Sequence, residues 1–505
     1  MKTRHLAIAG VAVLCSAFAC AAPPATARRP NVIVLLTDDL GYNDTGCYGA
    51  LPTHIRTPNI DRLAQQGIRF SDGHAASSVC TPSRYSLLTG QYAFRNPLGS
   101  GILPGDAPLS IQPGSYTLPA MFRSRGYATG FVGKWHLGLG GGGQAIAWNG
   151  ELKPGPEEIG FDETFYFPAT GDRVPTVFVR NHRVVNLDPK DPITINYQHR
   201  IGNEPTGITD PDLASVLRYL PGHGHADAIT NGVTRIGFMT GGKAALWKDE
   251  EMSDTLTGEA IGYIERHKEQ PFFLYFATHG IHEPRVPAPR FRGRSGAGVY
   301  GDFTEELDDA VGRVMTALDR LKLAGNTLFI FSSDNGGCSW VGYDYSPHDS
   351  LNGHKVNGIL RGEKGSLWEG GTREPFIVRW PGHVPSGIVS PALVSQTDLL
   401  ASLARLIGAP MVPGSAADSM DVLDALLGKS QTGRHELIEH QFGVAEKNCA
   451  LRVDQWKWIH GQLYNLANDL PESHDIAKQQ PARAKAMAAR LKEIYHAPQM
   501  RYPFQ

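Results

Sequence analysis

Apolar residues recur along the chain in short continuous runs that stop abruptly at polar residues. Four such runs lie at 32–36, 129–132, 272–276 and 328–331. Continuous apolar runs of this length are typical of strands that are buried on both faces of a sheet. Each run is followed within a few residues by Asp, Asn, Lys or His. The pattern therefore predicts a buried sheet whose strands deliver polar side chains to one edge.

Helical patterns lie between these runs. Thr57 and Pro58 fit the N-cap and first position of a helix that ends near Gly67. Residues 305–325 and 397–408 each place apolar side chains on one helical face. Strands that alternate with helices predict an α/β/α sandwich around a large, mixed, mostly parallel sheet. Ligands bind such sheets beyond the carboxyl ends of the strands, where the polar side chains are expected here.

Two segments depart from this alternation. Residues 201–255 are rich in Gly, Pro, His and polar residues, which indicates an insertion over the expected site. From about residue 430 the pattern changes to short runs that predict an antiparallel sheet, and residues 481–495 predict a closing amphipathic helix. We therefore expect a main domain at 28–429 and a smaller C-terminal α+β domain at 430–505.

The N-terminus has the pattern of a secretory signal. Basic residues precede an apolar run at 6–19 that is too short to span a bilayer, and Ala-Thr-Ala at 25–27 offers a cleavage site. We expect residues 1–27 to be removed and the mature chain, which shows no later membrane-spanning run, to be periplasmic or secreted. Cys20 also raises the option of a lipoprotein anchor, but the bulky Phe18 makes a poor lipobox.

Composition narrows the class of protein. The chain has 505 residues, of which 41% are apolar and 19% charged, so it can bury a large core. Its formal net charge of −2 gives no basic excess for a nucleic-acid or membrane-surface partner. Four cysteines lie outside the expected signal, and an exported chain could pair them, although a domain of this size needs no disulfide framework. They are Cys47, Cys80, Cys338 and Cys449.

Two predicted strands are followed by residues whose side-chain oxygens could bind a metal ion. Asp38 and Asp39 follow one run, and Asp334 and Asn335 follow another. Three carboxylates at one edge would repel one another without a cation between them. Carboxylate and amide oxygens favour Ca²⁺ or Mg²⁺ over Zn²⁺. A single Asp after a strand is more often a turn or cap residue, but an adjacent pair with a second acidic site favours a metal site.

The stretch SSVCTPSRYSLLTG, residues 77–90, places a cysteine near a predicted helix start. Thr81 fits an N-cap and Pro82 the first helical position, so Cys80 is expected just before the helix. The helix N-terminus and the charge of Arg84 would make a thiol there reactive. A thiolate is a soft ligand, however, and it would be a mismatch beside a hard cation.

The stretch CTPSRYSLLTG resembles the Cys-x-Pro-Ser-Arg signature of the formylglycine-dependent type I sulfatases, in the alkaline phosphatase-like superfamily. The resemblance covers nearly all of the mature chain, through GKWHLG, HGIHEP, SSDNGG and LRGEKGSLWEGG in the family's order, and it favours the arylsulfatase and bacterial polysaccharide sulfatase branch. It implies that a maturase converts Cys80 to formylglycine, whose hydrate offers oxygens to Ca²⁺, with Mg²⁺ less favoured. The implied metal ligands are Asp38, Asp39, Asp334, Asn335 and the modified Cys80.

The resemblance also implies hydrolysis of sulfate monoesters. The catalytic residues that it implies are Cys80, Arg84, Lys134, His136, His282 and Lys364. A hydroxyl of the hydrated residue 80 would attack sulfur, while the three cations hold the sulfate oxygens. His282 or Lys364 would protonate the leaving alcohol, and His136 would act as the base that expels sulfate. His279 fits two roles equally well: it could orient another residue of the site, or it could be purely structural.

Residues 169–193 resemble bacterial sulfatases that act on sulfated polysaccharides, and galactose or N-acetylgalactosamine 6-sulfate is the candidate substrate. Sugar hydroxyls could be bound by Asp172, Arg173, His223 and His225, although a structural salt bridge and loop histidines explain these residues equally well. Two alternatives stay open, namely a phosphodiesterase or phosphonate monoester hydrolase on the same scaffold and a non-catalytic protein that binds sulfated glycans. A cysteine phosphatase is disfavoured because Cys80 and Arg84 lie too close together in sequence. The sequence leaves the oligomeric state open.

Overall fold

The structure is a computed structural model that describes residues 29–143, 145–207, 213, 215, 217–222, 224–347 and 350–497. The expected signal at 1–27, with Cys20, and the candidate residue His223 lie outside the described residues. Within the described ranges, no helix is both long and apolar enough to cross a bilayer. The four cysteines of these ranges are free thiols.

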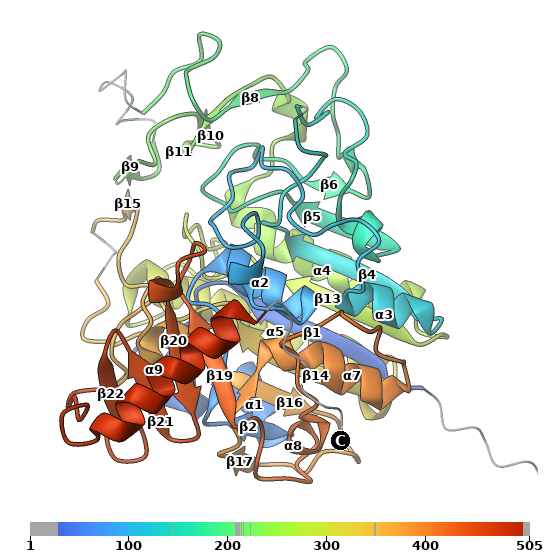
Figure 1. The fold of residues 1–505 in the computed structure, drawn as a ribbon. Coiled ribbons are helices and arrows are strands. Elements are labelled where there is room, and N and C mark those ends of the chain that lie inside the picture. Colours follow the sequence, from blue (N-terminus) through green and yellow to red (C-terminus); the bar gives the residue numbers. More distant parts are fainter. Residues whose placement is uncertain are drawn as a thin grey trace, which may run out of the picture.

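Among the described residues, the largest sheet has ten strands (Figure 1). In spatial order they are β17 (Ile388–Ser390), β2 (Ile68–Phe70), β16 (Phe376–Arg379), β14 (Thr327–Ser333), β1 (Asn31–Thr37), β13 (Phe272–Ala277), β4 (Ala128–Lys134), β5 (Glu163–Phe167), β6 (Val179–Arg180) and β7 (Arg183–Val184). The central strands from β14 to β5 are parallel, whereas β16 and β6 pair antiparallel with their neighbours. The predicted mixed, mostly parallel sheet is confirmed.

The four apolar runs of the sequence form β1, β4, β13 and β14, which lie side by side in the sheet. Alternate residues of β1 belong to different cores, because successive side chains of a strand point to opposite faces. Val34 and Leu36 pack in one core, and Ile33 and Leu35 in the other. Strands buried on both faces therefore account for the continuous apolar runs.

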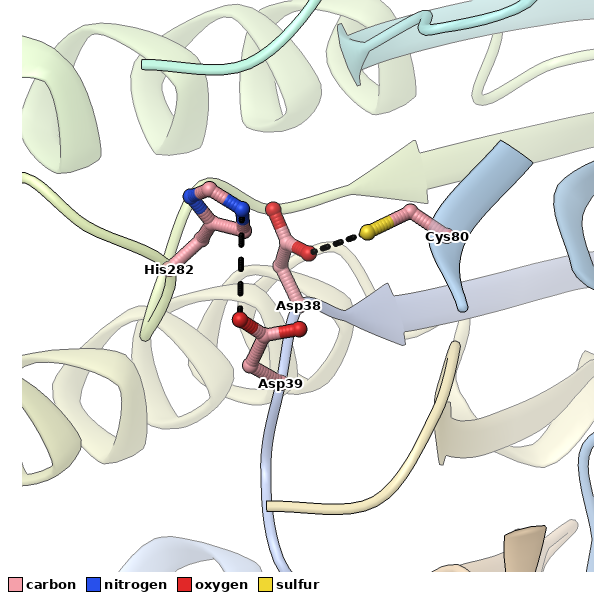
Figure 2. A group of neighbouring side chains, drawn as sticks. All are labelled: Asp38, Asp39, Cys80 and His282. Atoms are coloured by element: carbon pink, nitrogen blue, oxygen red, sulfur yellow. Dashed lines mark hydrogen bonds and ion pairs between the residues drawn. The ribbon is translucent and has the colours of Figure 1, made fainter. Parts of the chain in front are cut away.

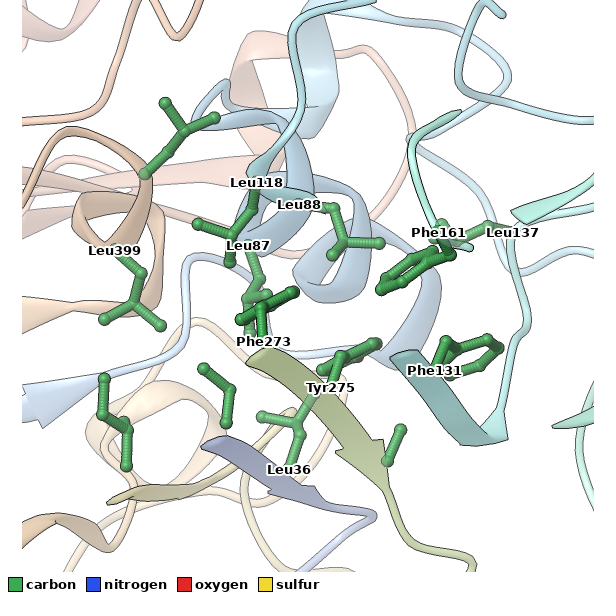
Figure 3. Packing of buried hydrophobic residues seen from close by; sticks show 14 of the residues in the cluster. Leu36, Leu87, Leu88, Leu118, Phe131, Leu137, Phe161, Phe273, Tyr275 and Leu399 are labelled. Atoms are coloured by element: carbon green, nitrogen blue, oxygen red, sulfur yellow. The ribbon is translucent and has the colours of Figure 1, made fainter. Parts of the chain in front are cut away.

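Helices cover both faces of the sheet. The main helices are α1 (Pro58–Gln65), α2 (Cys80–Thr89), α3 (Leu118–Ser124), α4 (Met252–Arg266), α5 (Gly298–Arg320), α6 (Glu369–Thr372), α7 (Leu399–Ile407) and α8 (Leu423–Leu426). Side chains of α2, α3, α7 and α8 fill the first core, part of which Figure 3 shows with Leu87, Leu118 and Leu399 close to Phe273. Side chains of α1, α4 and α5 fill the second core. These three layers form the predicted α/β/α sandwich.

The described part of the segment predicted as an insertion consists mainly of turns and loops, with short strands and two 3₁₀ turns. The strands that form two-stranded sheets in the described chain are β3 (Gly73–His74), β8 (Thr194–Asn196), β9 (Leu220–Pro221), β10 (Ile229–Thr230), β11 (Val233–Thr234), β12 (Phe238–Thr240), β15 (Tyr343–Asp344) and β18 (Val394–Ser395). Helix α4 begins at Met252, inside the segment predicted to be irregular up to residue 255. Its first turn is polar, with Ser253 and Asp254, so apolar periodicity does not reveal where the helix starts.

The C-terminal part contains the predicted antiparallel sheet and helix. The sheet consists of β19 (Glu436–His440), β20 (Cys449–Val453), β21 (Trp456–Ile459) and β22 (Gln462–Asn465), and α9 (Pro481–His496) packs on it (Figure 1). This sheet is joined to the main domain beside α2, because Ser78 N donates to His440 O at 2.8 Å. The domain boundary near residue 430 remains a prediction.

Candidate active site

The carboxyl ends of β1 and β14 bring the four predicted oxygen ligands together. Asn335 Nδ2 donates to Asp39 Oδ1 at 2.8 Å, and Asp39 N donates to Asp334 Oδ1 at 3.3 Å. In the parallel register Thr37 lies opposite Ser333, so the residues that follow each strand leave the sheet at the same level. All four ligand candidates are buried, with exposed fractions of 3% or less.

Two predicted lysines are paired to the aspartates that follow β1. Lys134, at the end of β4, places Nζ 2.7 Å from Asp38 Oδ2. Lys364 places Nζ 2.7 Å from Asp39 Oδ1. Asp39 has a positive φ of 62°, a backbone conformation that side-chain-bearing residues rarely adopt. The backbone is thus held in an uncommon conformation at Asp39, the residue that pairs with Lys364.

Arg84 forms the third ion pair from the second turn of α2. Its Nε and Nη2 donate to Asp334 Oδ2 at 2.9 and 2.6 Å, and Nη1 donates to Lys134 O at 3.2 Å. The guanidinium and the carboxylate are both fully buried. The cluster therefore holds three carboxylates and three cations out of water, ready to exchange partners with a bound anion.

The residues of this cluster fit a hard cation. Asn335 Oδ1 is buried and has no hydrogen-bond partner within the described ranges, as a metal-ligand oxygen would without its ion. Burial raises the pKa of Asp38 to about 7, with Asp334 and Asp39 adding to the shift and Lys134 opposing it. Ligand atoms of Asp38, Asp39, Cys80 and His282 lie within 4.8 Å of one another, and Figure 2 shows these side chains converging. A divalent ion would relieve the repulsion between the carboxylates.

Cys80 is the first residue of α2 rather than the residue before the helix. Val79 is the N-cap, in extended conformation, and the Thr81 hydroxyl donates to His136 O at 2.9 Å instead of capping. The predicted cap was wrong because the bonds of Ser77 and Ser78 to the C-terminal sheet keep the backbone extended up to Val79.

The Cys80 thiol is not activated. Burial raises its pKa to about 12, outweighing Lys134 and Lys364, while Asp334 and Asp38 raise it further. The prediction of a reactive thiolate was therefore wrong for this environment, because desolvation of the charge exceeds the effect of the helix N-terminus. Sγ lies 3.8 Å from Asp38 Oδ1, so the side chain does point into the predicted metal site (Figure 2).

Two predicted histidines each direct a bare ring nitrogen into buried space. His136 Nε2 lies 2.9 Å from Leu103 O, and His282 Nδ1 lies 2.7 Å from Glu283 O. A carbonyl oxygen only accepts, so the proton of each ring sits on the nitrogen named. Burial and nearby lysines hold the pKa of both histidines well below the usual range. Both rings are thus neutral, with His136 Nδ1 and His282 Nε2 unprotonated.

His279 has a different environment. Its ring packs edge-on against Phe167 and Phe303, with ring centroids 5.8 and 5.5 Å apart. Burial lowers its pKa to about 4. These contacts favour the structural role over the supporting one.

The candidate sugar-binding residues are brought together next to the histidines. Arg173 Nη1 lies 3.1 Å and His225 Nε2 2.9 Å from the buried Asp172 carboxylate. The charge of Arg173 helps to lower the pKa of His136, and His282 helps to lower the pKa of Asp172. The candidate sugar-binding residues therefore lie beside the two candidate catalytic histidines. The salt bridge foreseen as the alternative is present, so the sugar-binding role remains a prediction.

Sequence reasoning missed two buried carboxyl groups near the site. Glu283 accepts from Gly342 N at 2.7 Å and lies 3.8 Å from His225. Burial raises the pKa of Glu374 well above the usual range, with Asp334 adding to it, and neither of its oxygens has a hydrogen-bond partner in the part of the chain that the structure describes. The position of Glu283 between a histidine and a proline was a usable signal, whereas Arg-Glu-Pro around Glu374 resembles ordinary surface sequence.

Comparison with known proteins gives a consistent result. The protein family described as Sulfatase matches residues 30–409. An N-acetylgalactosamine-6-O-sulfatase of Bacteroides thetaiotaomicron is 45% identical over 487 residues, covering 92% of this chain and 93% of that protein. Human arylsulfatase A is 34% identical over 420 residues, covering 83% of this chain and 72% of that protein.

Comparison with solved structures agrees with the sequence comparison. A structure described under the metabolism of multiple glycosaminoglycans by Bacteroides thetaiotaomicron, labelled 6S-sulf, matches with a TM-score of 0.89 and 45% identity, covering 93% of this chain and 100% of that chain. Ps i-CgsB in complex with k-i-k-neocarrahexaose matches with a TM-score of 0.68 and 26% identity, covering 93% of both chains.

Proposed function

The chain belongs to the sulfatase family and is a sulfuric ester hydrolase, and on this premise we propose that it removes the 6-sulfate from N-acetylgalactosamine or galactose in sulfated sugars. The name of the 45% identical Bacteroides protein supports this substrate, since the likeness covers 92% of the chain. The observation that carries the chemistry is the buried cluster of three carboxylates and three cations around Cys80.

The site implies two groups beyond the encoded side chains. We infer that Asp38, Asp39, Asp334 and Asn335 hold Ca²⁺, in line with the orphaned Asn335 oxygen. We infer also that residue 80 works as formylglycine, since its thiol is protonated and its side chain faces oxygen ligands. When present, the ion would neutralise charge on the sulfate group and the hydrated aldehyde would supply the attacking hydroxyl.

The cations of the cluster bind the substrate. Lys134, Lys364 and Arg84 have donors at 2.6 to 2.7 Å from carboxylate oxygens, and sulfate oxygens would accept the same hydrogen bonds. Because the cluster is buried, these charges act in a low dielectric, where they stabilise developing negative charge strongly. The backbone already places each donor, so substrate binding requires only that sulfate oxygens replace carboxylate oxygens as the acceptors.

The two histidines supply proton transfer in opposite directions. His136 Nδ1 is bare and buried, so it can accept a proton from residue 80; the Thr81 hydroxyl fixes the His136 backbone beside that residue. His282 Nε2 faces Asp39 at 3.9 Å and is the nitrogen that would carry a proton to the leaving alcohol. A bound sulfate ester is an anion and would raise the pKa of His282, which favours this acid role.

The substrate proposal is tested with two isomers. We expect sulfate release from a 6-sulfated N-acetylgalactosamine disaccharide to exceed release from its 4-sulfated isomer by about 10²-fold or more, because only one geometry places the ester oxygen at the cation cluster. Ion chromatography of released sulfate measures both. Faster turnover of a phosphodiester or phosphonate monoester on the same sample would contradict the proposal, as would a preference for the 4-sulfate.

Replacing His282 by alanine should separate substrates by leaving group. For a sugar sulfate we expect kcat/KM to fall about 10²–10⁴-fold, because an alkoxide leaves poorly without a proton. For an aryl sulfate with a good leaving group the loss should stay below about tenfold. The exposed His435, whose side chain is 78% accessible, provides the matched control variant His435→Ala. Equal losses on both substrates would argue against the acid role.

A further inference from the structure

A second group of ligand-type side chains lies at the opposite end of the sheet from Cys80. It consists of Glu157 and Glu158, in the 3₁₀ turn Pro156–Ile159, and His182, in the β6–β7 hairpin. Their ligand atoms lie within 4.8 Å of one another. Thr164, at the amino end of β5, contacts the group, whereas Lys134 of the active site lies at the carboxyl end of the parallel strand β4.

The two carboxylates are oriented by fixed hydrogen bonds. Thr164 Oγ1 donates to Glu157 Oε1 at 2.6 Å, and Gly155 N donates to Glu158 Oε2 at 2.6 Å. The other oxygen of each carboxylate faces His182, with Nε2 at 3.4 Å from Glu157 Oε2 and 3.1 Å from Glu158 Oε1. The Glu157 side chain is 10% exposed, and its Oε2 has no hydrogen-bond partner in the described chain. One imidazole nitrogen carries at most one proton, so it cannot satisfy both oxygens.

These separations fit tetrahedral coordination. Metal–ligand bonds of about 2.0–2.1 Å at a tetrahedral centre put neighbouring ligand atoms about 3.3 Å apart. The two separations from His182 Nε2 to the carboxylate oxygens, 3.1 and 3.4 Å, lie on either side of that value. One imidazole with two carboxylates is a ligand set that suits Zn²⁺ and similar transition metals, with a further position left for water.

The charge balance also favours an ion. Among the described residues, no lysine or arginine nitrogen lies within 4.0 Å of the carboxylates of Glu157 and Glu158. The group formed by Asp72, His74 and Glu369 is different, because Arg373 lies 2.9 Å from Asp72 and 2.6 Å from Glu369. Protein cations therefore neutralise the Asp72 group, whereas the Glu157 and Glu158 carboxyls face an imidazole and no such cation in the described chain.

We propose that Glu157, Glu158 and His182 bind a divalent transition-metal ion, Zn²⁺ fitting best, that fastens the β6–β7 hairpin to the turn before β5. The ion is structural: it stabilises the edge of the sheet, where β6 and β7 are only two residues long and make few hydrogen bonds. The site is independent of sulfate hydrolysis, and its test does not depend on the proposed substrate.

Zinc titration of tag-free, Ca²⁺-saturated protein tests the site. By calorimetry at pH 7.5 we expect one Zn²⁺ per chain in the wild type, with affinity at least about tenfold weaker in His182→Ala and in the near-isosteric Glu158→Gln. Zn²⁺ should raise the Tm of the wild type and not that of these variants. Co²⁺ should give d–d absorption bands in the wild type that both variants lose.

Two further variants make the outcome decisive. His435→Ala removes an exposed histidine elsewhere and should bind Zn²⁺ like the wild type. Asp39→Asn alters the active site and should also keep this Zn²⁺ site. Absence of Zn²⁺ binding in the wild type would overturn the proposal. Binding that survives both His182→Ala and Glu158→Gln, or that is lost in Asp39→Asn, would overturn it equally.

Discussion

Replacing Cys80 by alanine or serine should lower turnover of a sulfated sugar by about 10³-fold or more while the protein still folds. The expected loss is large because alanine cannot become the formylglycine that attacks sulfur, and serine does not match the cysteine of the Cys-x-Pro-Ser-Arg signature. Folding should survive because, among the described residues, Sγ makes a single weak polar contact, 3.8 Å from Asp38 Oδ1. Sulfate release, with the Tm of each variant, measures the two effects separately.

The Cys80 experiment has a matched control within the chain. Cys449 is also a buried free thiol, 1% exposed, but it lies in the C-terminal sheet, so Cys449→Ala should keep wild-type turnover. Mass analysis of the peptide around residue 80 in the parent protein should show the exchange of thiol sulfur for aldehyde oxygen. Near wild-type turnover by Cys80→Ala, or full activity of a parent that carries unmodified cysteine, would sink the assignment.

Replacing Lys457 by methionine should lower the free energy of unfolding by about 3–5 kcal/mol. Lys457 lies in β21 and is fully buried, with Nζ 2.9 Å from Glu369 and 2.7 Å from Glu439. Glu472 lies 3.2 Å away on a third side. Methionine has a similar shape but no charge, so the variant leaves three carboxylates buried together without their shared cation. Urea unfolding followed by tryptophan fluorescence measures the change.

The loss at Lys457 should also depend on pH. Burial already raises the pKa of Glu472 to about 7, Lys457 holds it down, and Glu369 raises it. Without the lysine these carboxyls can remain buried by binding protons, so the destabilisation should be larger at pH 8 than at pH 5.5. The exposed Lys478 in the same domain supplies the control Lys478→Met, which should change stability by less than about 0.5 kcal/mol. A Lys457→Met variant within about 1 kcal/mol of the wild type at pH 8 would contradict the expectation.

The Lys457 cluster connects the C-terminal sheet to the active site through α6. Glu369 N, at the start of this helix, donates to Glu472 Oε2 at 2.7 Å. Further along, Gly371 O accepts from Gly336 N, in the loop after β14, at 3.0 Å, and Thr372 O accepts from Ala75 N, on the segment leading to Cys80, at 2.9 Å. Loss of Lys457 should therefore reduce turnover as well as stability.

The amino-acid sequence by itself determined which segments form the central strands and which residues gather at their carboxyl ends. Each of β1, β4, β13 and β14 has a continuous, mainly apolar centre, because both its faces are covered, and a pattern of this kind is visible without a structure. Polar residues directly after those strands had to gather at one edge, since parallel strands end together. For this reason Asp38, Asp334 and Lys134 could be assigned to one site in advance.

Only the tertiary structure decided how those residues are charged and paired. The sequence indicated a reactive thiol at Cys80, but burial among carboxylates keeps the thiol protonated, and the degree of burial depends on which elements pack over it. Lys457 and Glu369 are 88 residues apart, and no local pattern predicts their contact. Local periodicity reports which face of a strand or helix is apolar. The desolvation and pairing of charges are set by contacts between distant segments, and these exist only in the folded chain.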